Sequence, residues 1–230
     1  MYKKKTFLAI IPARGGSKRL PKKNILNLNR KPLIAWSIKA GLKSTYIDKV
    51  IVSSDKDYIL KIAKNYGAQT IKRPKQLASD TSKIFYTIHH ALLNLRKYDY
   101  IVLLQPTSPL RNEKHIDDAI KFLTAKKADA VIGVCETDHS PLWSSTLPDD
   151  RSLVNFRQKK AKDKRSQDLE KYFRINGAIY ICKTEKFLKE KGFFIKKNIF
   201  AFIMDRESSI DIDERIDFLF AEFLIKLIKS

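Results

Sequence analysis

The sequence has little cysteine and no long apolar run. Its two cysteines, Cys135 and Cys182, lie far apart in apolar, strand-like segments, which predicts buried thiols rather than a disulfide framework or a metal site. No apolar stretch approaches the roughly 18 residues that a membrane-spanning helix needs. The apolar run Phe7–Ile11, behind the N-terminal lysines, is too short for a signal peptide. We therefore expect a cytoplasmic protein with no membrane partner.

Histidine is scarce as well. The four histidines, His89, His90, His115 and His139, show no spacing typical of a zinc site. No Ser-His-Asp arrangement can be assembled from the sequence either. These absences favour neither zinc chemistry nor a covalent nucleophile.

Acidic residues are missing from positions 1–47, which hold twelve basic residues. Residues 151–165 hold seven basic residues and one acidic residue, and the formal net charge of the chain is +21. A basic surface attracts phosphates of any kind. The two segments fit a site for a small polyanion as readily as a track for a nucleic-acid backbone, so charge alone does not decide.

Strands and helices are expected to alternate along most of the chain. The composition, 43% hydrophobic and 31% charged, is that of a globular protein, and the length suits a single domain, 1–230. Short apolar runs predict buried strands, and apolar residues at helical spacing predict helices between them. This order predicts an α/β fold with a doubly wound, mainly parallel, Rossmann-like sheet. The expected strands are 6–12, 49–53, 68–71, 100–104, 130–135, 178–182 and 200–204, and the expected helices are 32–44, 57–66, 84–95, 115–123, 184–190 and 214–227.

Two C-terminal features complete this prediction. Residues 137–171 are rich in Ser, Pro, Asp and Lys, with little helical period. Because a structureless loop of that length is uncommon in a compact domain, we expect a protruding segment with β-hairpin character that reaches a partner subunit. The last helix has one expected apolar face, formed by Ile216, Leu219, Phe220, Phe223, Leu224 and Leu227.

The segment Arg14–Asn24 follows the first expected strand, where ligands bind in a doubly wound sheet. Gly15 and Gly16 let the backbone approach a phosphate closely. The cations Arg14, Lys18, Arg19, Lys22 and Lys23 supply countercharge. The spacing is neither that of a Walker loop nor that of a dinucleotide fingerprint. The segment is either a phosphate site or a flexible basic turn.

A second candidate site is Ser208–Asp213. Alternate residues of an extended segment face the same way, so Asp211 and Asp213 present two carboxylates together. Paired carboxylates suit Mg²⁺, which completes its shell with water and phosphate oxygens. The alternative is that Asp213 only caps the final helix.

Other polar residues lie near further strand ends: Gln105 and Arg73 follow expected strands, Ser79–Thr81 opens the next helix, and Arg174–Gly177 precedes a late strand. Each fits ordinary cap and turn chemistry as well as a binding role.

Taken together, five motifs resemble the CMP-sialic acid synthetases, the acylneuraminate cytidylyltransferases. In chain order they are Pro12–Lys18 with Lys23-Asn24, Arg73–Thr81, Leu103–Arg111, Asn176–Ile181 and Ser209–Asp213. The resemblance implies that the anomeric hydroxyl of a nine-carbon 2-keto sugar acid attacks the α-phosphate of CTP. It also implies a homodimer that exchanges the 137–171 segment.

The resemblance assigns roles to residues of this chain. It makes Arg14, Lys23 and Asp211 catalytic, and it assigns Mg²⁺ to Asp211 and Asp213. Sugar binding falls to Gln105, Arg174 and Asn176. Nucleotide binding falls to Ala13, Arg14, Gly15, Ser17, Lys18, Lys23, Asn24, Arg73, Asp80 and Ser82.

The sugar side departs from the family pattern. Members commonly have Arg-Gln-x-Leu-Pro before the Asn-Gly-Ala-Ile-Tyr motif, where this chain has Ser166–Glu170. Trp143 stands where some sialate enzymes have a lysine. N-acetylneuraminate is the expected substrate, with legionaminate or pseudaminate as alternatives.

Two more distant alternatives remain. The last two motifs argue against the related enzyme that activates the eight-carbon acid of lipopolysaccharide. A basic nucleic-acid-binding protein would explain the charge but not the paired aspartates, and no nucleic-acid module is recognisable, so we expect no specific nucleic-acid partner.

Overall fold

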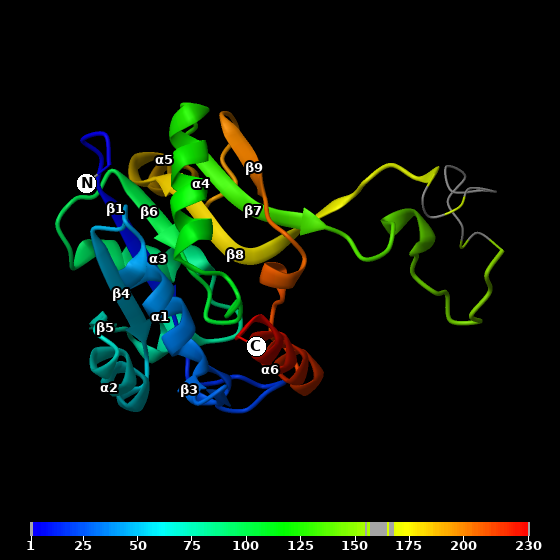
Figure 1. Ribbon diagram of the computed structural model, residues 1–230, viewed down its shortest axis with the longest axis horizontal. Coiled ribbons are helices and arrows are strands. Elements are labelled where there is room, and N and C mark those ends of the chain that lie inside the picture. Colours follow the sequence, from blue (N-terminus) through cyan, green and yellow to red (C-terminus); the bar gives the residue numbers. More distant parts are fainter. Residues whose placement is uncertain (1, 155, 157–164, 166–167, 230) are drawn as a thin grey trace.

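The computed structural model describes residues 2–154, 156, 165 and 168–229. A central sheet of seven strands, in the order β5-β4-β1-β6-β8-β7-β9, carries helices on both faces (Figure 1). The strands are β1 Phe7–Pro12, β4 Lys49–Ser54, β5 Gln69–Lys72, β6 Tyr100–Leu103, β7 Ala130–Glu136, β8 Phe173–Lys183 and β9 Ile199–Ile203, and a small antiparallel pair joins β2 Asn27–Leu28 to β3 Lys31–Pro32. The helices are α1 Leu33–Lys43, α2 Asp57–Asn65, α3 Ile84–Leu93, α4 Glu113–Ala125, α5 Thr184–Glu190 and α6 Arg215–Lys229.

The sheet is mainly parallel. β1 pairs in parallel with β4 and β6, β4 with β5, and β7 with β9, whereas β8 runs antiparallel to both β6 and β7. This arrangement confirms the predicted α/β fold with a doubly wound, mainly parallel sheet. The expected strand 178–182 is the second half of the longer β8.

Apolar residues of β1 alternate between two cores, one on each face of the sheet. Phe7, Ala9 and Ile11 pack toward the core that includes residues of α1, α2 and α4. Leu8 and Ile10 pack toward the core with α3 and α5. Burial of β1 on both faces explains why its sequence is a continuous apolar run rather than an alternating one.

Both cysteines lie in the sheet and are buried, as predicted. Burial raises the pKa of the Cys182 thiol to about 12, so this thiol is unreactive at neutral pH. In the described part of the chain, no helix is both long and apolar enough to cross a membrane.

The expected apolar face of the last helix is not the side that the core covers. α6 packs on Leu20, Leu28 and Leu33 through its buried residues Phe218, Ala221 and Ile225. Of the expected face, Leu224 is buried, but Ile216, Leu219, Phe220, Phe223 and Leu227 are exposed. The helix is apolar on more than one side, so its periodicity did not define which side the core covers.

The described part of the 137–171 segment leaves the sheet between β7 and β8 and extends away from the body of the molecule (Figure 1). At its base the hydrogen bonding between β7 and β8 continues by one more pair, since Thr137 N–H donates to Tyr172 O at 2.9 Å. The predicted β-hairpin character is wrong for the described part of this segment, which contains the 3₁₀ helix Pro141–Trp143 but no strand. Ser166 and Gln167, part of the departure from the family pattern, lie outside the described residues.

The chain order also defines a switch point in the sheet. From β1 the chain passes to β4 and β5 on one side, and then crosses to β6 on the other. In open α/β sheets, ligands bind at the carboxyl ends of the strands at such a point. Because β8 is antiparallel, its first residues, 173–177, reach the same edge.

Candidate active site

A pocket of about 590 Å³ lies at this switch point. Its walls are the loop after β1, the β5–α3 connection, the end of β6 and the segment before α6. The lining includes most of the residues predicted from the sequence: Arg14, Ser17, Lys18, Lys23, Asn24, Arg73, Asp80, Ser82, Gln105, Asp211 and Asp213. The fold thus gathers into one site residues that lie up to two hundred positions apart.

The basic loop faces two acidic groups across the pocket. Arg14 Nη1 and Lys18 Nζ each lie 2.6 Å from a different carboxylate oxygen of Asp80. The hydrogen bond from Lys18, reinforced by Arg14, lowers the pKa of Asp80 below its usual range. Asp80 therefore stays ionised and holds the two cations at the pocket mouth.

Lys23 is the most enclosed of the paired loop cations, with 12% of its side chain exposed. Its Nζ donates to Ile212 O at 2.6 Å and to Asp213 Oδ1 at 3.1 Å. Arg19 pairs with the other Asp213 oxygen at 2.7 Å. The N–H groups of Asp213 and Glu214 bond to Asp217 Oδ2, so Asp217 serves the start of α6 while the Asp213 carboxylate faces the loop.

Asp211 is the least satisfied acidic group in the described site. Its Oδ1 is buried and has no hydrogen-bond partner among the described residues. Burial raises the pKa of Asp211, and the nearby negative charge of Asp213 adds to this effect. A buried carboxylate of this kind is stabilised by a cation.

The donor set fits Mg²⁺. No group of three or more His, Cys, Asp or Glu side chains able to hold a metal is present among the described residues. Mg²⁺ does not require one, because it is commonly bound by one or two carboxylates and takes its other ligands from water and substrate phosphates. Asp211, with Asp213 beside it, supplies this kind of partial shell.

An irregularity in β8 shapes the pocket wall. The β7–β8 register shifts between Ile132 and Val134, and Gly177 adopts a φ of +74° within the irregular stretch. A Cβ at Gly177 would lie 3.0 Å from Gln105 Oε1 and 3.5 Å from Asp211 Oδ2. Gly177 therefore provides both the left-handed backbone conformation and the room for these two side chains.

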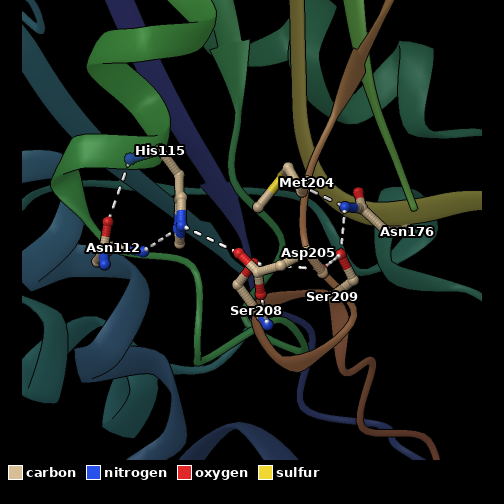
Figure 2. A network of polar contacts seen from close by, with 7 residues as sticks. All are labelled: Asn112, His115, Asn176, Met204, Asp205, Ser208 and Ser209. Carbon is tan, nitrogen blue, oxygen red and sulfur yellow. Dashed lines mark hydrogen bonds and ion pairs between the residues drawn. The ribbon is translucent and has the colours of Figure 1, made fainter. Parts of the chain in front are cut away.

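Four predicted residues do not line the pocket. Ala13 is buried and extends the β1–β4 pairing through its N–H, which donates to Ser53 O. The Gly15 N–H donates to Asp55 Oδ1 at 2.9 Å. Arg174 Nη2 donates to Ser209 O at 3.3 Å. Asn176 is 1% exposed, and its amide donates to Ser209 Oγ at 2.9 Å (Figure 2).

Two further polar residues beneath the pocket were not predicted. The Asp55 side chain, 7% exposed, accepts the Gly15 N–H and lies close enough to Arg73 to oppose the fall in pKa that burial imposes on that guanidinium. Arg111 is fully buried and donates to Ser37 Oγ at 2.7 Å, and burial lowers its pKa to about 9. Asp55 follows β4 just as Gln105 follows β6, so the strand-end rule would have found it. For Arg111 the sequence offers no signal beyond its place in the Leu103–Arg111 motif.

The pocket chemistry suits a polyphosphate. Its lining carries five cationic side chains, Arg14, Lys18, Arg19, Lys23 and Arg73, and among the described lining residues there is no Cys or His. Such a site binds and positions phosphates and stabilises developing negative charge without a covalent nucleophile.

Comparisons with known proteins agree with this geometry. Residues 8–227 match the family described as Cytidylyltransferase. The N-acylneuraminate cytidylyltransferase of Escherichia coli O18:K1:H7 is 42% identical over 212 residues, which cover 92% of this chain and 50% of that protein. The CMP-N,N'-diacetyllegionaminic acid synthase of Legionella pneumophila is 35% identical over 96% of both chains. This chain thus spans about half the length of the first relative and nearly all of the second.

A solved structure shares the fold. The CMP:2-keto-3-deoxy-manno-octonic acid synthetase, solved with CTP, superposes with a TM-score of 0.72 at 16% identity and covers 97% of this chain and 99% of its own.

Proposed function

The chain belongs to the cytidylyltransferase family, and we propose that it transfers CMP from CTP to a nine-carbon 2-keto sugar acid. The observation that carries the proposal is Asp211, which lines the pocket together with the basic loop and whose buried Oδ1 has no hydrogen-bond partner among the described residues. This arrangement provides a divalent-cation ligand beside countercharge for a triphosphate. The favoured acid is N-acetylneuraminate.

In the proposed reaction, the anomeric oxygen of the acid attacks the α-phosphorus of CTP. The bond from this phosphorus to the oxygen bridging to the β-phosphate breaks, the anomeric hydroxyl loses its proton, and pyrophosphate leaves. Transfer of this type depends chiefly on positioning and countercharge. Arg14, Ser17, Lys18 and Lys23 bind the triphosphate, and the cations among them stabilise the departing pyrophosphate.

Asp80 and Asp213 hold the loop cations in the structure, and we propose that phosphate oxygens share these cations in the complex. Asp211 and Asp213 would hold Mg²⁺, which when bound polarises the phosphate oxygens. Asn24, Arg73 and Ser82 place the nucleotide, with the Ala13–Gly15 backbone beneath it. Asn24 already donates its amide to Arg14 O at 2.8 Å, which fixes the loop.

Gln105, at the end of β6, is the residue proposed to contact the sugar acid from inside the pocket. Arg174, which donates to Ser209 O, and the buried Asn176 would act on the acid from β8, outside the pocket lining. The same reaction on legionaminate or pseudaminate is the alternative, since one relative named above is a legionaminic acid synthase. We also propose a cytoplasmic homodimer that uses the 137–171 segment, and no specific nucleic-acid partner.

The test is pyrophosphate release by the purified chain with CTP and Mg²⁺ and, in parallel, N-acetylneuraminate, legionaminate and pseudaminate. We expect release with at least one acid, fastest with N-acetylneuraminate, and none without acid. Asp211→Asn should lower kcat by about 10²-fold or more, since it removes a metal ligand at a charge-stabilising site. Asp118→Asn, an exposed carboxylate on α4, is the matched control and should leave kcat unchanged.

Two results would contradict the proposal. The activity is absent if no acid releases pyrophosphate above the CTP-only background. Asp211 is not a metal ligand if the folded Asp211→Asn variant turns over like the Asp118→Asn control.

A further inference from the structure

The turn Asp205–Ser209 lies directly before the segment that carries Asp211 and Asp213 (Figure 2). Within the turn, Ser208 N–H donates to Asp205 Oδ1 at 2.6 Å. Ser209 Oγ donates to Asp205 O, also at 2.6 Å. These short bonds close the turn, and Ser209 is its last residue and is fully buried.

β8 holds the turn from one side. Asn176 Nδ2 donates to Ser209 Oγ at 2.9 Å, while its Oδ1 accepts the Ala178 N–H at 3.0 Å. A Cβ on the neighbouring Gly133 would lie only 2.7 Å from that Oδ1, so Asn176 is confined by its own strand and by β7. The Ser209 hydroxyl therefore both donates and accepts, and its position is fixed by two elements.

α4 approaches the turn from the other side. His115 Nδ1 accepts the Asn112 N–H at 3.2 Å in the capping box of α4, which places the proton of the neutral imidazole on Nε2. That nitrogen lies 3.7 Å from Asp205 Oδ2 (Figure 2). The contact is longer than a hydrogen bond, so Asn176 provides the firmer support.

Asp211 has few direct supports. The Thr107 side chain hydrogen-bonds to its carboxylate, but Oδ1 has no hydrogen-bond partner in the described part of the chain. The backbone next to it is tied by Ile212 N–H, which donates to Thr107 O at 2.8 Å. The orientation of the carboxylate therefore depends on Thr107 and on how the backbone is fixed at both sides of residue 211.

We propose that Ser209 is a positioning residue for the metal site. Its hydroxyl, bonded between Asn176 and the Asp205 carbonyl, fixes the chain two residues before Asp211 and so sets the affinity for the divalent cation. This inference rests on the proposed function. Groups that orient metal ligands from behind commonly change metal affinity by about 10- to 100-fold when removed.

The chain offers a matched control in the next residue. Ser208 lies in the same turn and is 6% exposed, but the hydrogen bonds of its hydroxyl stay within the turn, to Asp205. Ser209→Ala and Ser208→Ala remove the same atom from neighbouring positions. Only the first removes the hydrogen bond from Asn176 of β8, while Arg174 still reaches Ser209 O.

The experiment measures Mn²⁺ binding by electron paramagnetic resonance of the full chain with CTP and without sugar acid, so that no transfer occurs. We expect Ser209→Ala to weaken Mn²⁺ binding about 10-fold or more and Ser208→Ala to stay close to wild type. Melting temperatures without metal are recorded alongside, because a purely structural role would lower them and leave the Mn²⁺ affinity of the folded protein unchanged.

Equal Mn²⁺ affinity in wild type and Ser209→Ala, or equal losses in both serine variants, would overturn the inference. If wild type binds no Mn²⁺ with CTP, the proposed function fails first and the inference falls with it. If Ser209→Ala does not fold, Asn176→Ala removes the same link from the β8 side. That variant must then weaken Mn²⁺ binding for the inference to hold.

Discussion

At the scale of single residues, the buried Asp55 carboxylate positions groups of the proposed phosphate site. It accepts the Gly15 N–H and lies near Arg73, so it joins the basic loop to the β5–α3 connection. Asp55→Ala removes both interactions, and we expect the KM for CTP to rise about 10-fold or more, since an unsatisfied buried donor costs roughly 1–3 kcal/mol. Asp55→Asn keeps an acceptor for Gly15 but loses the charge, so its KM for CTP should lie between those of wild type and Asp55→Ala.

Steady-state kinetics at saturating acid give kcat and KM separately. Asp57→Ala is the control, because Asp57 lies two residues further on, is 81% exposed and pairs with Lys72. A KM for Asp55→Ala equal to that of the control would show that Asp55 has no part in nucleotide binding.

Individual site residues were predictable where strand ends and charge coincide. Arg14 and Gln105 follow expected strands, Asp211 was expected from alternation in an extended segment and Asp80 from the family resemblance, and all four line the pocket. Asn176 also lies at a strand end, yet its side chain is buried against Ser209. The sequence could not show this, because the direction of the side chain depends on the β8 irregularity at Gly177, which only strand pairing reveals.

At the scale of elements, Asp99 ties the starts of β1 and β6 together. Its Oδ2 accepts both the N–H and the hydroxyl of Thr6 at 2.9 Å, and Lys5 donates to Oδ1 at 3.1 Å. Burial opposes ionisation, but these hydrogen bonds hold the pKa of Asp99 below its usual range. A lowered pKa stabilises the fold above the unfolded value of about 3.9 and loses this effect as pH falls through the folded value.

We therefore expect Asp99→Asn to lower stability by roughly 1 kcal/mol at neutral pH, a modest value because the carboxylate is partly exposed. The difference from wild type should shrink as the pH falls below about 4. Urea unfolding between pH 3 and pH 7 measures it. A constant difference across this range would show that the ionised form of Asp99 has no special role.

Element order was easier to predict than element surroundings. The apolar runs located the strands, and the helical spacing located α1 through α6, because both patterns are local. The buried face of α6 and the antiparallel direction of β8 depend on contacts with distant segments. For α6, the choice between two apolar sides is made by Leu20, Leu28 and Leu33, which lie far away in the sequence.

At the scale of the whole molecule, two apolar surfaces lack cover on the described chain. One is the outer side of α6, with Phe220 at 48% and Phe223 at 59% exposure. The other is the projecting segment, where Leu153 is 62% and Val154 is 87% exposed. The described part of the segment points away from the body of the molecule, so Leu153 and Val154 are free to pack against another molecule (Figure 1). A second copy of the chain is the proposed occupant.

This proposal predicts a dimer of about twice 26.6 kDa by light scattering at micromolar concentration. Replacing both Leu153 and Val154 with Asp should shift the mass toward the monomer, because charges in an apolar interface lose hydration without gaining partners. Leu93→Asp, at a 72% exposed position on α3, adds the same kind of charge to a surface outside the segment and should leave the dimer intact. A monomeric wild type would refute the dimer, and a double variant that stays dimeric would place the contact elsewhere.

If the segment also completes the partner's pocket, the double variant should lose turnover in proportion to the monomer formed, while Leu93→Asp should keep wild-type turnover.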